Sequence, residues 1–220
     1  GQYGFQELDA TVNYLKENKL LNENGFLDIG ANIGFMSLYA ISKLQFKSAI
    51  CVEPDELNYS ILKDNLALNN LADKTRSFKV GLSSTTTEGK LIRSNDNYGD
   101  HRVFTDNELT GDDKYNGMSQ RRIVNIDLIT LDELSVTDKA FENISLICID
   151  VQGFELEILK GGRAFLSRGI PMLLEIDPYL LEKKNADKIS LSRELQKHYR
   201  LFVDVGSKNK EYPIEDFALF

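Results

Sequence analysis

The chain has 220 residues, of which 42% are hydrophobic and 27% are charged, and its formal net charge at pH 7 is −8. These values are typical of a single soluble domain, and the negative charge disfavours binding to nucleic-acid phosphates. No apolar run approaches the roughly 20 residues of a membrane span, and the N-terminus does not resemble a signal peptide, so we expect a cytoplasmic protein.

Short apolar runs alternate with segments of helical periodicity, a pattern typical of βα units on a mostly parallel sheet. The chain is expected to open with a helix over residues 5–22, in which Leu8, Val12 and Leu15 share one face. The predicted strands cover residues 26–29, 48–52, 76–80, 122–127, 144–149, 171–176 and 201–205. Because 144–149 is the most continuous apolar run, we expect that strand to be central.

Two further helices are predicted after the first two strands, and a third over residues 189–198. The apolar face of the helix after the first strand is marked by Ile33, Met36, Ala40 and Leu44. The corresponding face after the second strand is marked by Leu57, Ile61 and Leu68.

The region 83–120 is polar and much longer than an ordinary connection of about 4 to 6 residues. Within it, 91–93 and 102–104 are predicted to form a short hairpin around a turn over 95–100. A long segment that leaves the sheet just after the third strand begins at the edge where ligands bind. It is therefore expected to form part of the pocket for the molecule on which the protein acts, and to cover that pocket as a lid.

Cys51 and Cys148 each lie in an apolar run, where a free thiol is usually a small core residue. We expect the strand order 3-2-1-4-5, in which 144–149 is the fourth strand of the sheet and 171–176 the fifth, so the two residues flank the first strand at a separation of about 10 Å. This exceeds the limit of about 7 Å for a disulfide, so no bridge is expected.

The turn after the first predicted strand carries the strongest local signal. Asp28 is followed by Gly30 and Gly34 at the start of a helix, which indicates close approach of the backbone to a ligand. A dinucleotide-binding fold would place a third glycine where Asn32 stands. S-adenosylmethionine has an ammonium and a sulfonium group in place of a pyrophosphate, and an acid such as Asp28 suits those cations.

Twenty-five residues after Asp28, Glu53 ends the second strand, where a carboxylate can accept both hydroxyl groups of a ribose. Pro54 is expected to form a wall beside the adenine. A glycine turn alone is more often a plain βα turn beside a solvent-facing acid, but the spacing to Glu53 favours a cofactor site.

Four ordered blocks resemble the FkbM-like methyltransferases, a branch of the seven-stranded S-adenosylmethionine-dependent enzymes. The blocks are 27–34, 52–54, 131–134 and 149–155 with 159–162, so the resemblance spans most of the chain. It implies an α/β fold with a doubly wound, mostly parallel, Rossmann-like sheet of seven strands and helices on both faces, in one domain over 1–220.

The same resemblance implies which residues hold S-adenosylmethionine. Those expected at the methionine end are Asp28, Gly30, Asn32 and Gly34. The ribose is expected at Glu53, and the adenine beside Pro54, Gly81 and Leu82. Asp150 is expected to face the methyl group and the acceptor. The family usually has Glu where this chain has Gln152, so only a hydrogen-bonding role is expected there.

The implied activity is methyl transfer to a small-molecule acceptor, by O-methylation of a sugar, a lipid head group or a secondary metabolite. A hydroxyl acceptor must lose a proton, and Asp150 and His101 are the candidate bases. The candidate acceptor-binding residues are Tyr98, Arg102, Gln152 and Glu175. His101, Tyr98 and Arg102 are alternatively ordinary loop residues, and no metal site is predicted.

Two other functions remain open at this point. A nicotinamide-dependent oxidoreductase would use a similar sheet, although Asn32 in the glycine turn counts against it. A noncatalytic cofactor-binding module is the second alternative, in which Gln152 would mark a decayed site. The oligomeric state cannot be read from the sequence.

Overall fold

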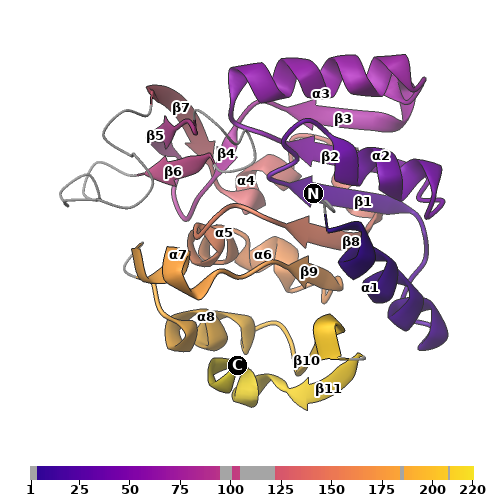
Figure 1. The fold of residues 1–220 in the computed structure, drawn as a ribbon, viewed down its shortest axis with the longest axis vertical. Coiled ribbons are helices and arrows are strands. Elements are labelled where there is room, and N and C mark those ends of the chain that lie inside the picture. Colours follow the sequence, from indigo (N-terminus) through magenta and orange to yellow (C-terminus); the bar gives the residue numbers. More distant parts are fainter. Residues whose placement is uncertain (1–3, 95–100, 105–121, 184–185, 208) are drawn as a thin grey trace.

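The structure is a computed structural model that describes residues 4–94, 101–104, 122–183, 186–207 and 209–220. Its main sheet has five parallel strands in the order β3-β2-β1-β8-β9 (Figure 1). The strands are Gly25–Ile29 (β1), Ser48–Val52 (β2), Thr75–Phe78 (β3), Ile144–Ile149 (β8) and Met172–Leu174 (β9). The predicted order 3-2-1-4-5 is confirmed, with β1 in the middle and the wholly buried β8 beside it.

Cys51 and Cys148 lie on either side of Asp28, because Asp28 is in register with Cys51 on β2 and with Cys148 on β8. Both thiols are buried and free. The predicted placement of the two cysteines around the first strand is therefore confirmed.

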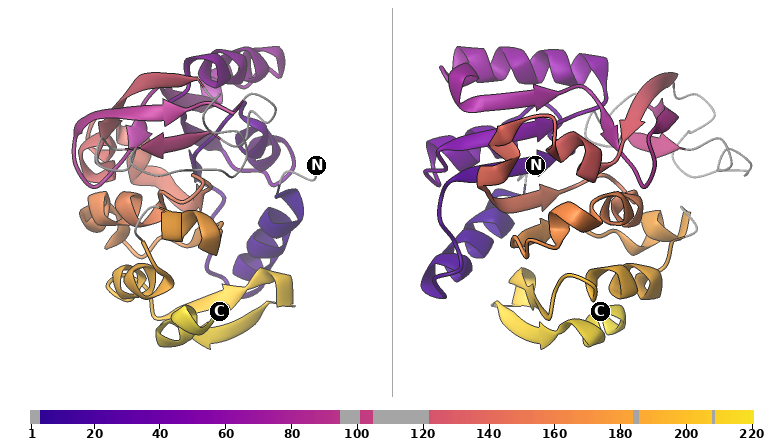
Figure 2. Two further views of the ribbon diagram at one scale, coloured as in Figure 1. Left: turned by 60° about the vertical axis from the view of Figure 1, so that its left-hand side comes forward. Right: turned by 180° about the vertical axis from the view of Figure 1, so that it is seen from behind.

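Side chains of the main sheet alternate between two hydrophobic clusters, one on each face. One face is covered by α1 (Phe5–Glu17), α2 (Phe35–Ser42) and α3 (Glu56–Leu68). The other is covered by α4 (Leu131–Ser135), α5 (Glu155–Gly161), α6 (Arg163–Leu166), α7 (Pro178–Lys183) and α8 (Lys188–Leu195). Figure 2 shows these two helical layers from two sides. Among the described helices, none has the length and apolarity needed to cross a membrane.

The predicted buried face of α3 is wrong. Leu57 and Leu68 are exposed, whereas Asn58, Leu62 and Leu66 are buried. Leu62 and Leu66 pack into the core on this face, which also carries the buried Asn58, and counting apolar residues alone cannot detect a face that includes an asparagine.

A second sheet of four strands lies beyond the carboxyl ends of the main strands, in the order β4-β7-β5-β6 (Figure 1). Its strands are Gly81–Leu82 (β4), Thr87–Ile92 (β5), Arg102–Phe104 (β6) and Ile123–Ile129 (β7). The predicted hairpin is confirmed, since Leu91 pairs with Val103 in an antiparallel register. Its predicted turn over 95–100 lies outside the described residues, and the predicted strand 122–127 belongs to this sheet instead of the main one.

The main sheet does not have seven strands within the described residues. Leu201–Asp204 (β10) and Lys210–Pro213 (β11) instead form a separate antiparallel ribbon. Phe202 and Tyr212 stack on it, and Phe202 packs edge-on against Phe217, so the ribbon has a small aromatic core of its own. Short 3₁₀ segments cover Ala72–Lys74, Lys139–Asn143, Val205–Ser207 and Ile214–Leu219.

Candidate functional site at the carboxyl edge of the sheet

Four of the predicted site residues follow directly from the ends of neighbouring parallel strands. Gly30 follows β1, Glu53 follows β2, Asp150 follows β8, and Glu175 follows β9. Because parallel strands end at a common edge, the strand order brings these residues to one side of the sheet. This is the edge at which ligands of open α/β sheets bind.

The turn after β1 has a left-handed backbone at Gly30 (φ 84°), Asn32 (φ 51°) and Gly34 (φ 87°). A Cβ atom on Gly30 would lie 1.9 Å from the backbone oxygen of Asp150. The turns after β1 and β8 therefore pack so closely that only glycine can stand there. The sequence predicts close approach of the backbone to a ligand at this turn, but the first atom that a side chain at Gly30 would meet belongs to the protein.

Asp28 is buried beneath the first turn of α2. Its carboxylate accepts a hydrogen bond from the Ser37 hydroxyl at 2.6 Å and another from the Ser37 backbone N–H. Burial, opposed by these hydrogen bonds and reinforced by the charge of Asp150, raises the pKa of Asp28 to about 6. Ser37 could not be predicted as the partner of Asp28, because a serine inside a helix has no distinctive sequence pattern.

Glu53 joins the ends of β1 and β2. Its carboxylate accepts the backbone N–H of Asn32 at 2.9 Å and that of Asp55 at 2.8 Å. A carboxylate has about four acceptor positions, so two remain for a ligand. The side chain is 5% exposed, and burial raises the pKa of Glu53 to about 7.

Asp55 is the N-cap of α3, where it accepts the backbone N–H groups of Leu57 at 2.9 Å and Asn58 at 3.1 Å. Its side chain is fully buried and also forms an ion pair with Arg93 of the second sheet. Neither Asp55 nor Arg93 is among the site residues predicted from the sequence, although an acid just before a helix is a recognisable cap signal.

His101 lies just before β6, on the same side of the molecule as the end of β2. Its Nδ1 accepts the backbone N–H of Ser94 at 3.2 Å, and its Nε2 lies 4.0 Å from Asp55 Oδ2. The contacts made by both ring nitrogens suit a residue that holds the second sheet against α3. A role for His101 as a base stays a prediction.

Asp150 is exposed at the end of β8 and accepts a hydrogen bond from the Gln152 side chain at 2.6 Å. Glu175 stands next to it, because its backbone N–H donates to Ile149 at 3.0 Å. Burial and the charge of Asp150 raise the pKa of Glu175 above its ordinary value. The hydrogen-bonding role predicted for Gln152 is thus compatible with its position.

The loop between β8 and α5 is closed by a buried acid, Glu155. The carboxylate of Glu155 accepts the backbone N–H of Gly153 at 2.9 Å, and a Cβ on Gly153 would lie 2.8 Å from the backbone oxygen of Leu180. Burial raises the pKa of Glu155, and the charge of Asp150 adds to the effect. The close packing of this loop therefore explains the glycine and the acid in 149–155, one of the blocks that resemble the FkbM-like methyltransferases.

A small cavity of about 30 Å³ lies between the two sheets at this edge. It is lined by predicted cofactor residues together with Val103 of β6 and Phe154 before α5. The predicted residues that it brings together are Gly30, Pro54, Gly81 and Leu82. The cavity is much smaller than an adenosine group, so a nucleoside can enter only if side chains on its walls move.

Of the two remaining predicted acceptor-binding residues, Tyr98 and Arg102, the structure describes Arg102. Tyr98 falls outside the described residues. Arg102 is half-buried at the start of β6, where it pairs with Ile92 of β5.

Comparison with known proteins gives matches of three kinds. The model of a protein family described as Methyltransferase FkbM domain matches residues 28–207. Methyltransferase sdnD from Sordaria araneosa is 30% identical over 162 residues, which are 64% of this chain and 61% of that protein. The crystal structure of Methyltransferase FkbM from Methylobacillus flagellatus KT matches 96% of this chain and 54% of its own, with a TM-score of 0.52 and 18% identity.

The structural match supports the mixed α/β fold. At 18% identity it shows the fold alone. The chain spans little more than half the length of the solved structure and 61% of the length of the curated relative. The family match covers most of the chain and includes Asp28, Glu53, Asp150 and Glu175. The chain therefore belongs to the FkbM methyltransferase family.

Proposed function

We propose that this protein transfers the methyl group of S-adenosylmethionine to a hydroxyl group of a small-molecule acceptor. The observation that carries the proposal is electrostatic. Burial is the main cause of the raised pKa values of Asp28, Glu53, Glu155 and Glu175, and neighbouring charges add to it: that of Asp150 at Asp28, Glu155 and Glu175, and those of Asp55 and Asp28 at Glu53, so the carboxyl groups at this edge repel one another. A ligand with a net positive charge relieves this repulsion, whereas the pyrophosphate of a nicotinamide cofactor adds to it.

The geometry at the edge suits the parts of such a cofactor. Glu53 has two free acceptor positions for the ribose hydroxyls, and its two backbone hydrogen bonds hold it in place. Pro54 and Leu82 offer apolar walls for the adenine in the cavity between the sheets. Asp28 and the turn through Asn32 and Gly34 are proposed to hold the methionine end.

When bound, S-adenosylmethionine supplies a methyl group activated by a sulfonium. The residues of the chain have to orient the acceptor and remove its proton. Asp150 and Glu175 stand side by side at the ends of β8 and β9, and Gln152 fixes one oxygen of Asp150 at 2.6 Å. We assign the base to this pair, which would accept the proton of the acceptor hydroxyl.

His101 is proposed to act by positioning. It lies against Asp55, two residues after Glu53 in the chain, and it connects the β5–β6 hairpin to the start of α3. The hairpin also places Val103 in the wall of the cavity. Movement of this hairpin would therefore open or close the adenosine pocket, whereas the lid expected for the region 83–120 was one over the acceptor pocket.

The acceptor class follows from the family resemblance alone, and it comprises sugars, lipid head groups and secondary metabolites. The acidic charge of the chain makes nucleic acid an unfavourable substrate.

A screen of acceptors that bear hydroxyl groups, with amines of similar structure included, tests the proposal. The purified protein is incubated with S-adenosylmethionine and each acceptor, and S-adenosylhomocysteine and methylated product are quantified by mass spectrometry. Equal amounts of both products, formed only when the acceptor is present, would support the proposal. Methylation of amines but not of hydroxyls would contradict the O-methylation, and failure of the protein to bind S-adenosylmethionine would contradict the cofactor.

A further inference from the structure

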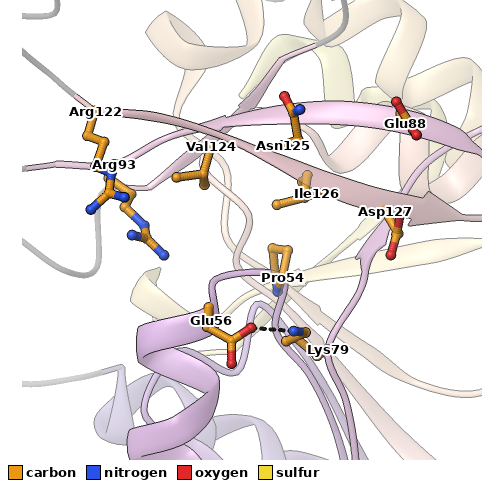
Figure 3. Close-up of a pocket in the computed structure, with 10 residues that line it drawn as sticks. All are labelled: Pro54, Glu56, Lys79, Glu88, Arg93, Arg122, Val124, Asn125, Ile126 and Asp127. Atoms are coloured by element: carbon orange, nitrogen blue, oxygen red, sulfur yellow. Dashed lines mark hydrogen bonds and ion pairs between the residues drawn. The ribbon is translucent and has the colours of Figure 1, made fainter.

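A second, larger cleft lies on the far side of Pro54 from the adenosine cavity. Its volume is about 410 Å³, within the ~300–1,000 Å³ typical of small-molecule sites. One wall is the β5–β7 ribbon, and the other is the segment around the start of α3 together with Lys79 (Figure 3). Pro54 lines both the cleft and the cavity, so the two spaces are neighbours.

Two arginines stand side by side at one end of this cleft. Arg93 donates its backbone N–H to the Arg122 carbonyl at 2.9 Å, which continues the antiparallel register of β5 and β7. Residues directly opposite in such a pair send their side chains to the same face, and like charges so placed destabilise the sheet. Figure 3 shows both guanidinium groups directed toward the start of α3.

Among the described residues, the ion pairs at this end of the cleft supply the carboxylate of Asp55 for one of the two guanidinium groups. Arg93 forms an ion pair with the buried Asp55, and His101 shares that same carboxylate at 4.0 Å. Arg122 is exposed and forms no ion pair with any residue that the structure describes. Lys79, farther along the cleft, is already paired with Glu56. An oxyanion placed between Arg93 and Arg122 would therefore meet a guanidinium group, that of Arg122, that no carboxylate of the described residues pairs with.

The rest of the wall is suited to a carbon skeleton. Val124 and Ile126 follow Arg122 on the same face of β7, because side chains two residues apart share a face. They lie opposite the Pro54 ring across the cleft (Figure 3). Glu88 and Asp127 stand at the other end, where their carboxylates can accept hydrogen bonds from hydroxyl groups.

We propose that this cleft binds a hydroxylated small molecule that carries a carboxylate or phosphate group, with the oxyanion held by Arg93 and Arg122. Guanidinium groups bind both oxyanions bidentately, and a pair of them offers a geometry that a lysine cannot match. The inference rests on the cleft alone and not on methyl transfer, so its test does not need an active enzyme.

Calorimetric titration tests the inference with four probes: glucuronate, glucose 6-phosphate, glucose and inorganic phosphate. We expect at least one of the two acidic sugars to bind about tenfold or more tightly than glucose, which lacks the oxyanion. Comparison of the two acidic sugars shows whether the carboxylate or the phosphate is preferred. Inorganic phosphate should bind more weakly than the preferred acidic sugar, since it makes no contact with Val124 or Ile126.

The Arg122→Gln variant is expected to lose about tenfold or more of the affinity for the acidic sugar and to keep its fold, because Arg122 is exposed. Arg193→Gln, on the exposed face of α8, is the matched control and should bind as the wild type does. Equal binding of glucose and the acidic sugars would overturn the proposal. So would an Arg122→Gln variant of unchanged affinity, or inorganic phosphate that binds as tightly as the sugars.

Discussion

Asn32 donates its backbone N–H to the Glu53 carboxylate at 2.9 Å and thereby ties the turn after β1 to the end of β2. Asn32 has a left-handed backbone, which turns its N–H toward the neighbouring strand. The Glu53 side chain is consequently fixed before any ligand arrives. Preorganisation of this kind lowers the entropic cost of binding.

Cofactor binding is predicted to release protons near neutral pH. Burial raises the pKa of Glu53 to about 7, so part of the population is protonated at pH 7. Ribose hydroxyls that donate to the charged carboxylate lower that pKa, and the proton leaves. The affinity should therefore increase as the pH rises through 7 and level off above it.

Calorimetry at pH 7 in buffers of different ionisation enthalpy measures this release. The apparent binding enthalpy should vary with the buffer for the wild type and much less for Glu53→Gln. An enthalpy that is the same in every buffer would show that Glu53 does not change its protonation on binding.

Gly30→Ala is predicted to destabilise the fold by more than about 2 kcal/mol, because the new Cβ meets Asp150 O and a left-handed backbone is strained for alanine. Gly34→Ala is the matched control, since its backbone is also left-handed but its Cβ would lie 3.2 Å from the flexible Leu62 side chain. It should cost about 1 kcal/mol. Urea unfolding compares the two, and equal losses would refute the close packing of the two turns.

Glu175→Gln is predicted to lower turnover by about 10²- to 10⁴-fold, the range of a lost general base, while cofactor affinity stays nearly unchanged. Because Glu175 has a raised pKa, wild-type kcat should rise with pH near neutrality, and the variant should lose that rise. Glu215→Gln, at an exposed site in the C-terminal segment, is the control. Wild-type kinetics in Glu175→Gln would remove this residue from the mechanism.

Cys51 and Cys148 are predicted to be inert in the folded protein. Burial raises the pKa of Cys51 to about 12 and that of Cys148 well above its ordinary value, so neither is a thiolate at pH 8. A chromogenic disulfide reagent should react with both thiols only after guanidinium unfolding. Rapid reaction of either thiol in the native state would place it outside the core.

The positions of the main strands could be predicted because each strand is a short apolar run, and their order could be predicted because the family resemblance implies a doubly wound sheet. The partners of Asp28 could not, since the contact with Ser37 depends on how α2 packs across the sheet. The arginine pair in the larger cleft was missed for the same reason. Arg93 and Arg122 become neighbours only through the register of β5 and β7, which no local pattern specifies.

The sequence also did not predict which sheet the last strands join. Residues 201–205 have the composition of a strand, but composition does not say which sheet a strand joins. The aromatic contacts of Phe202 with Tyr212 and Phe220 decide this in favour of a separate ribbon.

The most direct test of the central claim is calorimetric titration of the wild type and of Glu53→Gln with S-adenosylmethionine and with NAD. Glu142→Gln, an exposed site near the opposite edge of the sheet, serves as control. We predict one S-adenosylmethionine bound per chain, a loss of about 1 to 3 kcal/mol of binding free energy in Glu53→Gln alone, and no binding of NAD. Binding of NAD without binding of S-adenosylmethionine, or an affinity for S-adenosylmethionine that Glu53→Gln leaves unchanged, would contradict the account.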